Sequence, residues 1–118
     1  PIALDEELIS RTDNVERKRM LELIQPQFII LKPSLLGGFK ASKEWIFHAD
    51  SLGIDWRVTS ALESNVGLNA IAQWTYSLNA KGPQGLGTGS LFTNNIQSPL
   101  VITKACLSID NSISWDLI

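Results

Sequence analysis

The apolar run Phe28–Leu31, followed directly by Lys32 and Pro33, constrains the fold of this chain more than any other stretch. Four bulky apolar residues without polar alternation predict a parallel strand that is buried on both faces. Proline lacks a backbone donor and stops the strand ladder, so Lys32 should lie where the strand leaves the sheet. Ligands bind at this carboxyl-end edge in α/β folds. The alternative is a lysine that only reaches solvent at a strand end.

Strand-like and helix-like segments alternate on both sides of this run. Asp13, with Glu16 three residues later, resembles a capping box that opens the first helix. We expect strands at 2–4, 28–31, 55–60 and 84–89, a tight loop at 35–38, and helices at 13–24, about 42–53 and 65–78. A tail should follow, with strands at 100–103 and 113–115 joined through a turn at 110–111. This alternation predicts right-handed β-α-β units on a parallel sheet.

The number of predicted strands limits the architecture. Three β-α units and one further strand cannot close an eight-stranded barrel, which takes about 250 residues. An open sheet this short would leave two unpaired apolar edges. The chain of 118 residues should therefore be either a small doubly wound domain or half of something larger. It opens at Pro1 in what reads as a strand already in progress, which favours a piece of a longer polypeptide.

Composition excludes several classes of partner. Ten Lys and Arg residues stand against 12 Asp and Glu residues, a net charge of −2 without a basic patch, so nucleic acid is not expected. No apolar run reaches membrane-spanning length and no signal-peptide pattern opens the chain, which predicts no membrane association and a cytoplasmic location. The single cysteine, Cys106, cannot form an internal disulfide and is expected to be a small buried hydrophobe.

Residues that carry chemistry follow the predicted parallel strands, and the carboxyl ends of those strands share one edge of the sheet. Asp5 follows the first strand, Lys32 the second, residues 59–63 the third and residues 85–88 the fourth. A carboxylate beside a lysine suits oxygen ligation of a hard divalent cation, or electrostatic and proton-transfer work on an enolate. A capping or loop carboxylate is the simpler explanation for Asp5, and the adjacent Glu6 and Glu7 are competitors for its role.

The hydroxyls and free N–H groups of residues 60–65 could receive an anion, although an ordinary helix cap would explain them equally. The Gly85-x-Gly87-x-Gly89 spacing is weak as a phosphate loop because no helix and no lysine follow it. Close approach of the backbone to a ligand, or a bend, explains these glycines better. The sequence therefore places an anion or cation site at this edge without choosing between them.

Four stretches, in this order and spanning nearly the whole chain, resemble the carboxyl-terminal portion of the o-succinylbenzoate synthase family, in the muconate-lactonizing-like subgroup of the enolase superfamily. They are Ile2–Glu6, Ile30–Ser34 with the glycines at 37 and 38, Thr59–Asn69 and Gly85–Gly89. The resemblance implies the C-terminal half of a (β/α)7β TIM-like barrel, with strands five to eight in residues 1–98. Residues 99–118 would form a β-rich tail that packs on a capping domain.

The resemblance also implies roles for individual residues. Asp5 matches a carboxylate that binds Mg²⁺, and Lys32 matches a catalytic lysine that faces the enediolate. Thr59, Ser60 and Gly85 match positions that line the pocket for the substrate's succinyl carboxylate. The implied reaction, a step of menaquinone biosynthesis, is β-elimination of water from succinyl-hydroxy-cyclohexadiene-carboxylate, which makes the enzyme a carbon-oxygen lyase acting on a small molecule.

Other residues on which the family's chemistry depends would precede Pro1. One carboxylate holds Mg²⁺ poorly, so we expect this chain to be inactive alone and to need the rest of the barrel or self-association. Two other functions stay open. Related barrels reuse the lysine in N-acylamino acid racemases and dipeptide epimerases, and a half-barrel with exposed edges could instead be a non-catalytic interaction module.

Overall fold

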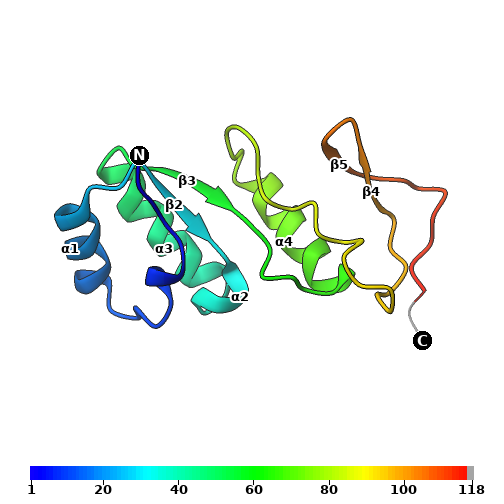
Figure 1. Cartoon of the computed structure of the whole chain (residues 1–118), viewed down its shortest axis with the longest axis horizontal. Helices are drawn as coiled ribbons and strands as arrows, with labels where there is room; N and C mark the ends of the chain where they lie inside the picture. The colour runs from blue at the N-terminus through cyan, green and yellow to red at the C-terminus, as the bar shows by residue number, and fades with distance from the viewer. Residues whose placement is uncertain (117–118) are drawn as a thin grey trace. The chain divides into compact units, whose positions relative to one another are not determined.

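The chain divides into two compact units, Pro1–Ala61 and Leu62–Ile118 (Figure 1). The first unit is built from three strands and the segments between them. The computed structural model describes residues 1–116. The strands β1 (Ala3–Leu4), β2 (Phe28–Leu31) and β3 (Asp55–Val58) pair in parallel in the order β1-β2-β3. In register, Leu4 lies opposite Ile29 and Leu31 opposite Val58. The predicted α/β class with a parallel sheet is therefore confirmed.

Helices connect these strands and cover one face of the sheet. The connection from β1 to β2 contains the 3₁₀ turn η1 (Glu6–Leu8) and α1 (Asn14–Ile24). The connection from β2 to β3 contains α2 (Pro33–Leu36) and α3 (Gly38–Ser51). Because α1 and α3 contact each other, they lie on the same face. No helix in the described part of the chain is long and apolar enough to cross a membrane.

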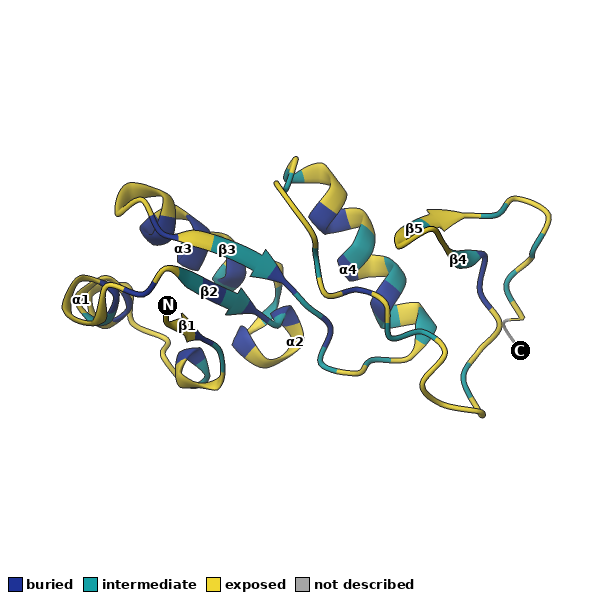
Figure 2. Ribbon diagram, turned by 45° about the horizontal axis from the view of Figure 1, so that its top comes forward, coloured by how far each residue is buried: buried dark blue, intermediate teal, exposed yellow. Residues whose placement is uncertain are grey.

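The strand β2 is covered unequally, as its burial pattern shows (Figure 2). Ile29 and Leu31 are fully buried, whereas Phe28 and Ile30 are only half-buried. The prediction of burial on both faces is wrong for this structure, because the helices cover one face only. On the other face Arg57 extends along the sheet, with its guanidinium carbon 5.1 Å from the centroid of the Phe28 ring. Its Nη1 donates to the carbonyl of Trp56 at 2.7 Å.

The boundaries of the helices follow their caps. The Asp13 carboxylate accepts from the N–H groups of Val15 and Glu16 at 2.9 and 3.0 Å, as the sequence predicted for the start of α1. The expected loop at 35–38 is wrong, because Pro33 opens the one-turn helix α2 and only Gly37, which has positive φ, separates α2 from α3. As a result α3 begins four residues before the expected Ser42.

The second unit contains α4 (Asn65–Ser77), which starts at the predicted residue and buries Leu68, Ile71, Trp74 and Thr75. The expected strand at 84–89 is absent from the described residues, where Gly85 makes only a single-residue bridge. Three glycines in this segment offer no side chains for packing, which weakens a strand. The fourth parallel strand predicted from the sequence is therefore not formed in this structure.

An antiparallel hairpin is the last regular element of the described residues. Its strands are β4 (Leu100–Thr103) and β5 (Cys106–Ile109), joined at Lys104 and Ala105, which both have positive φ. A turn does form at residues 110–113, where the Ile113 N–H donates to the Asp110 carbonyl at 3.1 Å and the Asp110 carboxylate accepts from the backbone N–H and hydroxyl of Ser112. It does not join two strands, because the predicted strand at 113–115 is absent from the described residues. Cys106 is exposed rather than buried. Residues 117 and 118 of the predicted tail lie outside the described residues.

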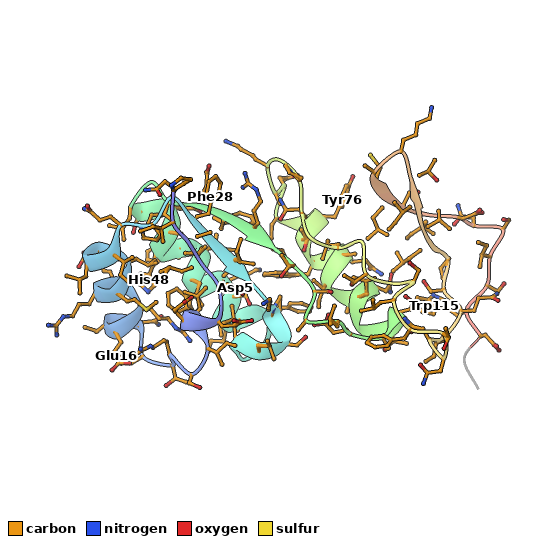
Figure 3. All side chains as sticks on the ribbon, in the orientation of Figure 1. Asp5, Glu16, Phe28, His48, Tyr76 and Trp115 are labelled. Carbon is orange, nitrogen blue, oxygen red and sulfur yellow. The ribbon has the colours of Figure 1, made fainter. Side chains whose placement is uncertain are left out.

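His48 on α3 provides a stability test for the first unit. It is 9 % exposed, and its Nε2 lies 3.3 Å from the Asn14 Oδ1 of α1 (Figure 3). Burial, followed by the nearby charges of Arg17 and Lys18, lowers the pKa of His48 below its ordinary 6.5. Below that pH the unfolded chain takes up a proton more readily than the folded chain, so the stability present at neutral pH is lost as the pH falls.

We therefore expect the free energy of unfolding to decrease between about pH 7.5 and pH 5, in the range where an unfolded histidine titrates. Urea unfolding at several pH values measures this slope, and the variant His48→Gln should flatten it. Carboxylates titrate alike in both proteins, so the difference between the two slopes isolates the histidine. Equal slopes in the wild-type chain and in His48→Gln would contradict the assignment of this pH dependence to His48.

Candidate functional site

Asp5 and Lys32 meet at the carboxyl ends of β1 and β2. Lys32 directly follows β2 and directly precedes Pro33, the first residue of α2. Asp5 directly follows β1 and precedes η1, beside the end of β2 (Figure 3). The Lys32 Nζ lies 2.8 Å from the Asp5 Oδ1 and 2.9 Å from its Oδ2. The prediction that these residues share one edge of the sheet is confirmed.

The neighbouring glutamates take different positions. The Glu7 carboxylate accepts from the backbone N–H of Asp5 at 3.0 Å, and this hydrogen bond lowers the pKa of Glu7. The Glu6 Oε1 lies 3.5 Å from the Lys32 Nζ, at the limit of a hydrogen bond, on a side chain that is 78 % exposed. Of the three adjacent acids, Asp5 is therefore the main partner of Lys32, a choice that the spacing in the sequence left open.

The ion pair determines the charge state of Lys32. The hydrogen bond to Asp5 is the largest influence and raises the pKa of Lys32, with the negative charges of Asp5 and Glu6 adding to it against the opposing effect of burial. The Lys32 side chain is 18 % exposed and the Asp5 side chain 38 %. At neutral pH the amine is thus an ammonium group, which can stabilise an anion.

Thr59 and Ser60 continue from β3 at the same edge of the sheet. The Thr59 N–H donates to the carbonyl of Leu31 at 2.9 Å, which places Thr59 level with Lys32 on the neighbouring strand. The Thr59 hydroxyl is buried and has no hydrogen-bond partner among the described residues. Ser60 is 7 % exposed. Three of the four predicted segments of this edge therefore gather in the first unit.

Gly85, the fifth predicted site residue, belongs to the second unit. It lies between Gln84 and Leu86, which line a cavity of about 1260 Å³ formed by α4, the loop after it and the β4-β5 hairpin. Asp5, Lys32, Thr59 and Ser60 do not line this cavity. The position of this cavity was not predicted from the sequence, because it depends on the hairpin turn at 104–105, six residues before the turn predicted at 110–111.

The described residues supply too few ligands for a magnesium ion. Carboxylate oxygens are the right donors, but Mg²⁺ requires about six oxygen ligands in near-octahedral geometry. Between residues 1 and 116 no group of three Asp, Glu, His or Cys side chains is arranged to hold a metal. The Asp5 carboxylate is also engaged with Lys32. These residues alone do not fit a magnesium site, and Asp5 could contribute only one of its ligands.

Comparison with known proteins gives specific relatives, although no protein-family model matches the chain. The o-succinylbenzoate synthase of Desulfotalea psychrophila is 55 % identical over 108 residues, which is 92 % of this chain and 29 % of the relative. The match falls in the C-terminal portion of that relative. The o-succinylbenzoate synthase of Vibrio cholerae is 32 % identical over 77 residues, which is 65 % of this chain and 23 % of the relative.

A solved structure agrees with the sequence matches. The crystal structure of MenC from Desulfotalea psychrophila LSv54 superposes with a TM-score of 0.87 at 55 % identity, covering 92 % of this chain and 30 % of the MenC chain. The resemblance stated from four short stretches of sequence is therefore confirmed over most of the chain. The chain spans less than a third of the length of these relatives.

Proposed function

We propose that this chain is the C-terminal part of an o-succinylbenzoate synthase of menaquinone biosynthesis, a carbon-oxygen lyase, in which Lys32 acts on the substrate. The observation that carries the proposal is the pairing of Asp5 and Lys32 at the carboxyl ends of adjacent parallel strands, in a chain 55 % identical to such a synthase. Parallel strands present catalytic residues at this end in α/β barrels. Sequence identity supplies the reaction class, since the fold alone would not.

The proposed architecture is the second half of a (β/α)7β TIM-like barrel. In it β1, β2 and β3 would be strands five to seven, the segment around Gly85 would provide strand eight, and residues 99–118 would approach a capping domain. Two features support this arrangement: the strands are ordered along the chain, and helices cover one face of the sheet while the other is half-exposed. A barrel would cover that second face, which makes the remaining part of the barrel the expected partner.

In the proposed reaction a base in the rest of the barrel takes the proton α to the carboxylate of succinyl-hydroxy-cyclohexadiene-carboxylate, and the C–H electron pair becomes negative charge on the two carboxylate oxygens of the enediolate. When the carboxylate re-forms, this electron pair makes the new C=C bond and the C–O bond to the β-hydroxyl group breaks. The hydroxyl group takes the proton back from the protonated base and leaves as water. The Lys32 ammonium, whose side chain is 18 % exposed, would stabilise the negative charge of the enediolate. Thr59, Ser60 and Gly85 would hold the succinyl carboxylate, with the buried Thr59 hydroxyl as an available donor.

We further propose Mg²⁺ as the cofactor of the complete enzyme, with Asp5 as one of its ligands. Bound Mg²⁺ would supply positive charge beside the developing anion. Because the described residues do not form a metal site alone, the contribution assigned to this chain rests on Lys32. A cytoplasmic location stays a prediction.

Assaying the complete polypeptide with two substrates tests this proposal. We expect o-succinylbenzoate to form from the cyclohexadiene substrate, followed by its absorbance, at a rate well above racemisation of an N-acylamino acid, followed by polarimetry. Efficient racemisation without dehydration would instead assign the chain to the racemases, which use the matching lysine as an acid and base. Neither activity, with stable self-association of the chain, would favour a non-catalytic interaction module.

A further inference from the structure

The turn between β1 and α1, residues 5–13, carries Asp5 and is held by a short series of hydrogen bonds. The Leu8 N–H donates to the Asp5 carbonyl at 3.1 Å, and the Arg11 N–H donates to the Leu8 carbonyl at 3.4 Å. Leu8 is 1 % exposed and anchors the middle of the turn in the core. The Arg11 carbonyl is the next acceptor in this series, so the group that donates to it adds a further bond that holds the turn.

That partner is Arg17 of α1, an arginine whose side chain is only 3 % exposed. Its Nε donates to the Arg11 carbonyl at 2.7 Å. Its Nη1 donates to the Asn14 Oδ1 and to the Glu44 carboxylate on α3. The guanidinium carbon lies 5.4 Å from the centroid of the Trp45 ring. One planar group therefore joins the turn, α1 and α3.

The two residues of the Asp5–Lys32 ion pair are held in place by different parts of the structure. Lys32 is fixed by the central strand β2 and by Pro33, which is fully buried. Asp5 lies beyond the two-residue strand β1, so its position depends more on the turn that follows. Since the Arg11 carbonyl of the turn accepts from Arg17, and Arg17 also pairs with Glu44, the arginine links the segment that carries Asp5 to α3.

We propose that Arg17 is a positioning residue, which holds the turn 5–13 through its Nε bond to the Arg11 carbonyl so that the Asp5 carboxylate meets Lys32. A lysine at this position could reach Glu44 but has no second donor at the place of Nε. The value of this positioning for catalysis rests on the proposed function, whereas the positioning itself does not. Its test therefore needs no substrate.

Amide hydrogen exchange of the whole 118-residue chain measures the effect. In Arg17→Lys, protection of the Leu8 and Arg11 amides should fall about fivefold to tenfold relative to that of Ile54, as expected for the loss of one buried hydrogen bond. The Ile54 N–H donates to the Ala49 carbonyl at 2.9 Å, away from the turn, and reports the stability of the unit. The NOE between the Asp5 Hβ and Lys32 Hε protons should weaken in the same variant.

Glu44→Gln is the matched control, because it removes the ion pair of Arg17 but leaves the Nε bond in place. It should lower overall stability without changing the protection ratio or the NOE. The proposal is overturned if Arg17→Lys leaves both readouts unchanged, or if Glu44→Gln alters them equally. Should Arg17→Lys fail to fold, the wild-type chain decides, since a scalar coupling across the hydrogen bond from the Arg17 Nε to the Arg11 carbonyl carbon must be present, and its absence refutes the proposal.

Discussion

Replacing Lys32 by alanine in the complete polypeptide should lower kcat/KM for dehydration about 10²–10³-fold, the loss typical of removing one preorganised group that stabilises an anion. The hydrogen bond to Asp5 and the charges of Asp5 and Glu6 keep the Lys32 amine protonated, so the ammonium needs no proton transfer before it meets the substrate. Steady-state formation of o-succinylbenzoate measures the loss. It should appear mainly in kcat, because the interaction strengthens as the anion develops.

Two further variants establish what the lysine does. Lys32→Arg retains a positive charge that cannot be removed, so it should keep more dehydratase activity than Lys32→Ala if the role is electrostatic. In a racemase, where the residue transfers protons, both variants should be equally inactive. Lys43→Ala, which removes an exposed lysine from α3, should leave the rate unchanged. A Lys32→Ala enzyme with the wild-type rate would exclude Lys32 from the reaction.

The 118-residue chain by itself should give no measurable o-succinylbenzoate. It matches only 29 % of the length of the Desulfotalea psychrophila synthase, and it contributes one carboxylate where Mg²⁺ requires about six oxygen ligands. The purified chain with excess Mg²⁺ is assayed against the complete polypeptide at equal molar concentration. Turnover by the chain that disappears on chelation would contradict this prediction, provided that the intact mass shows no longer polypeptide in the sample.

Local chemistry made part of the fold predictable. Asp13 marked the start of α1, Asn65 that of α4, and the unbroken apolar run marked β2 to the residue. Each of these signals acts within a few residues, through a cap or through burial. The meeting of Asp5 and Lys32 was also predictable, because parallel strands bring their carboxyl ends to one edge.

Features that depend on distant contacts could not be read in this way. The loop of the hairpin lies at Lys104 and Ala105, neither of which favours positive φ, whereas the sequence pattern favours Asp110 as the turn between two strands. The choice among Asp5, Glu6 and Glu7 required the conformation of η1. Arg17 carries one signal in the sequence: it lies four residues before the apolar Leu21, on the same face of α1, and these two are the buried residues of that helix.

The guanidinium of Arg57 on the half-exposed face of the sheet limits what can close over that face. Its described contacts are the Phe28 ring and the Trp56 carbonyl, and a guanidinium carries five N–H donors. A purely hydrocarbon cover would leave this cation in a medium of low dielectric constant. A polypeptide that packs on this face should therefore bring oxygen acceptors to Arg57. Charge as well as shape then decides which polypeptide can cover the face.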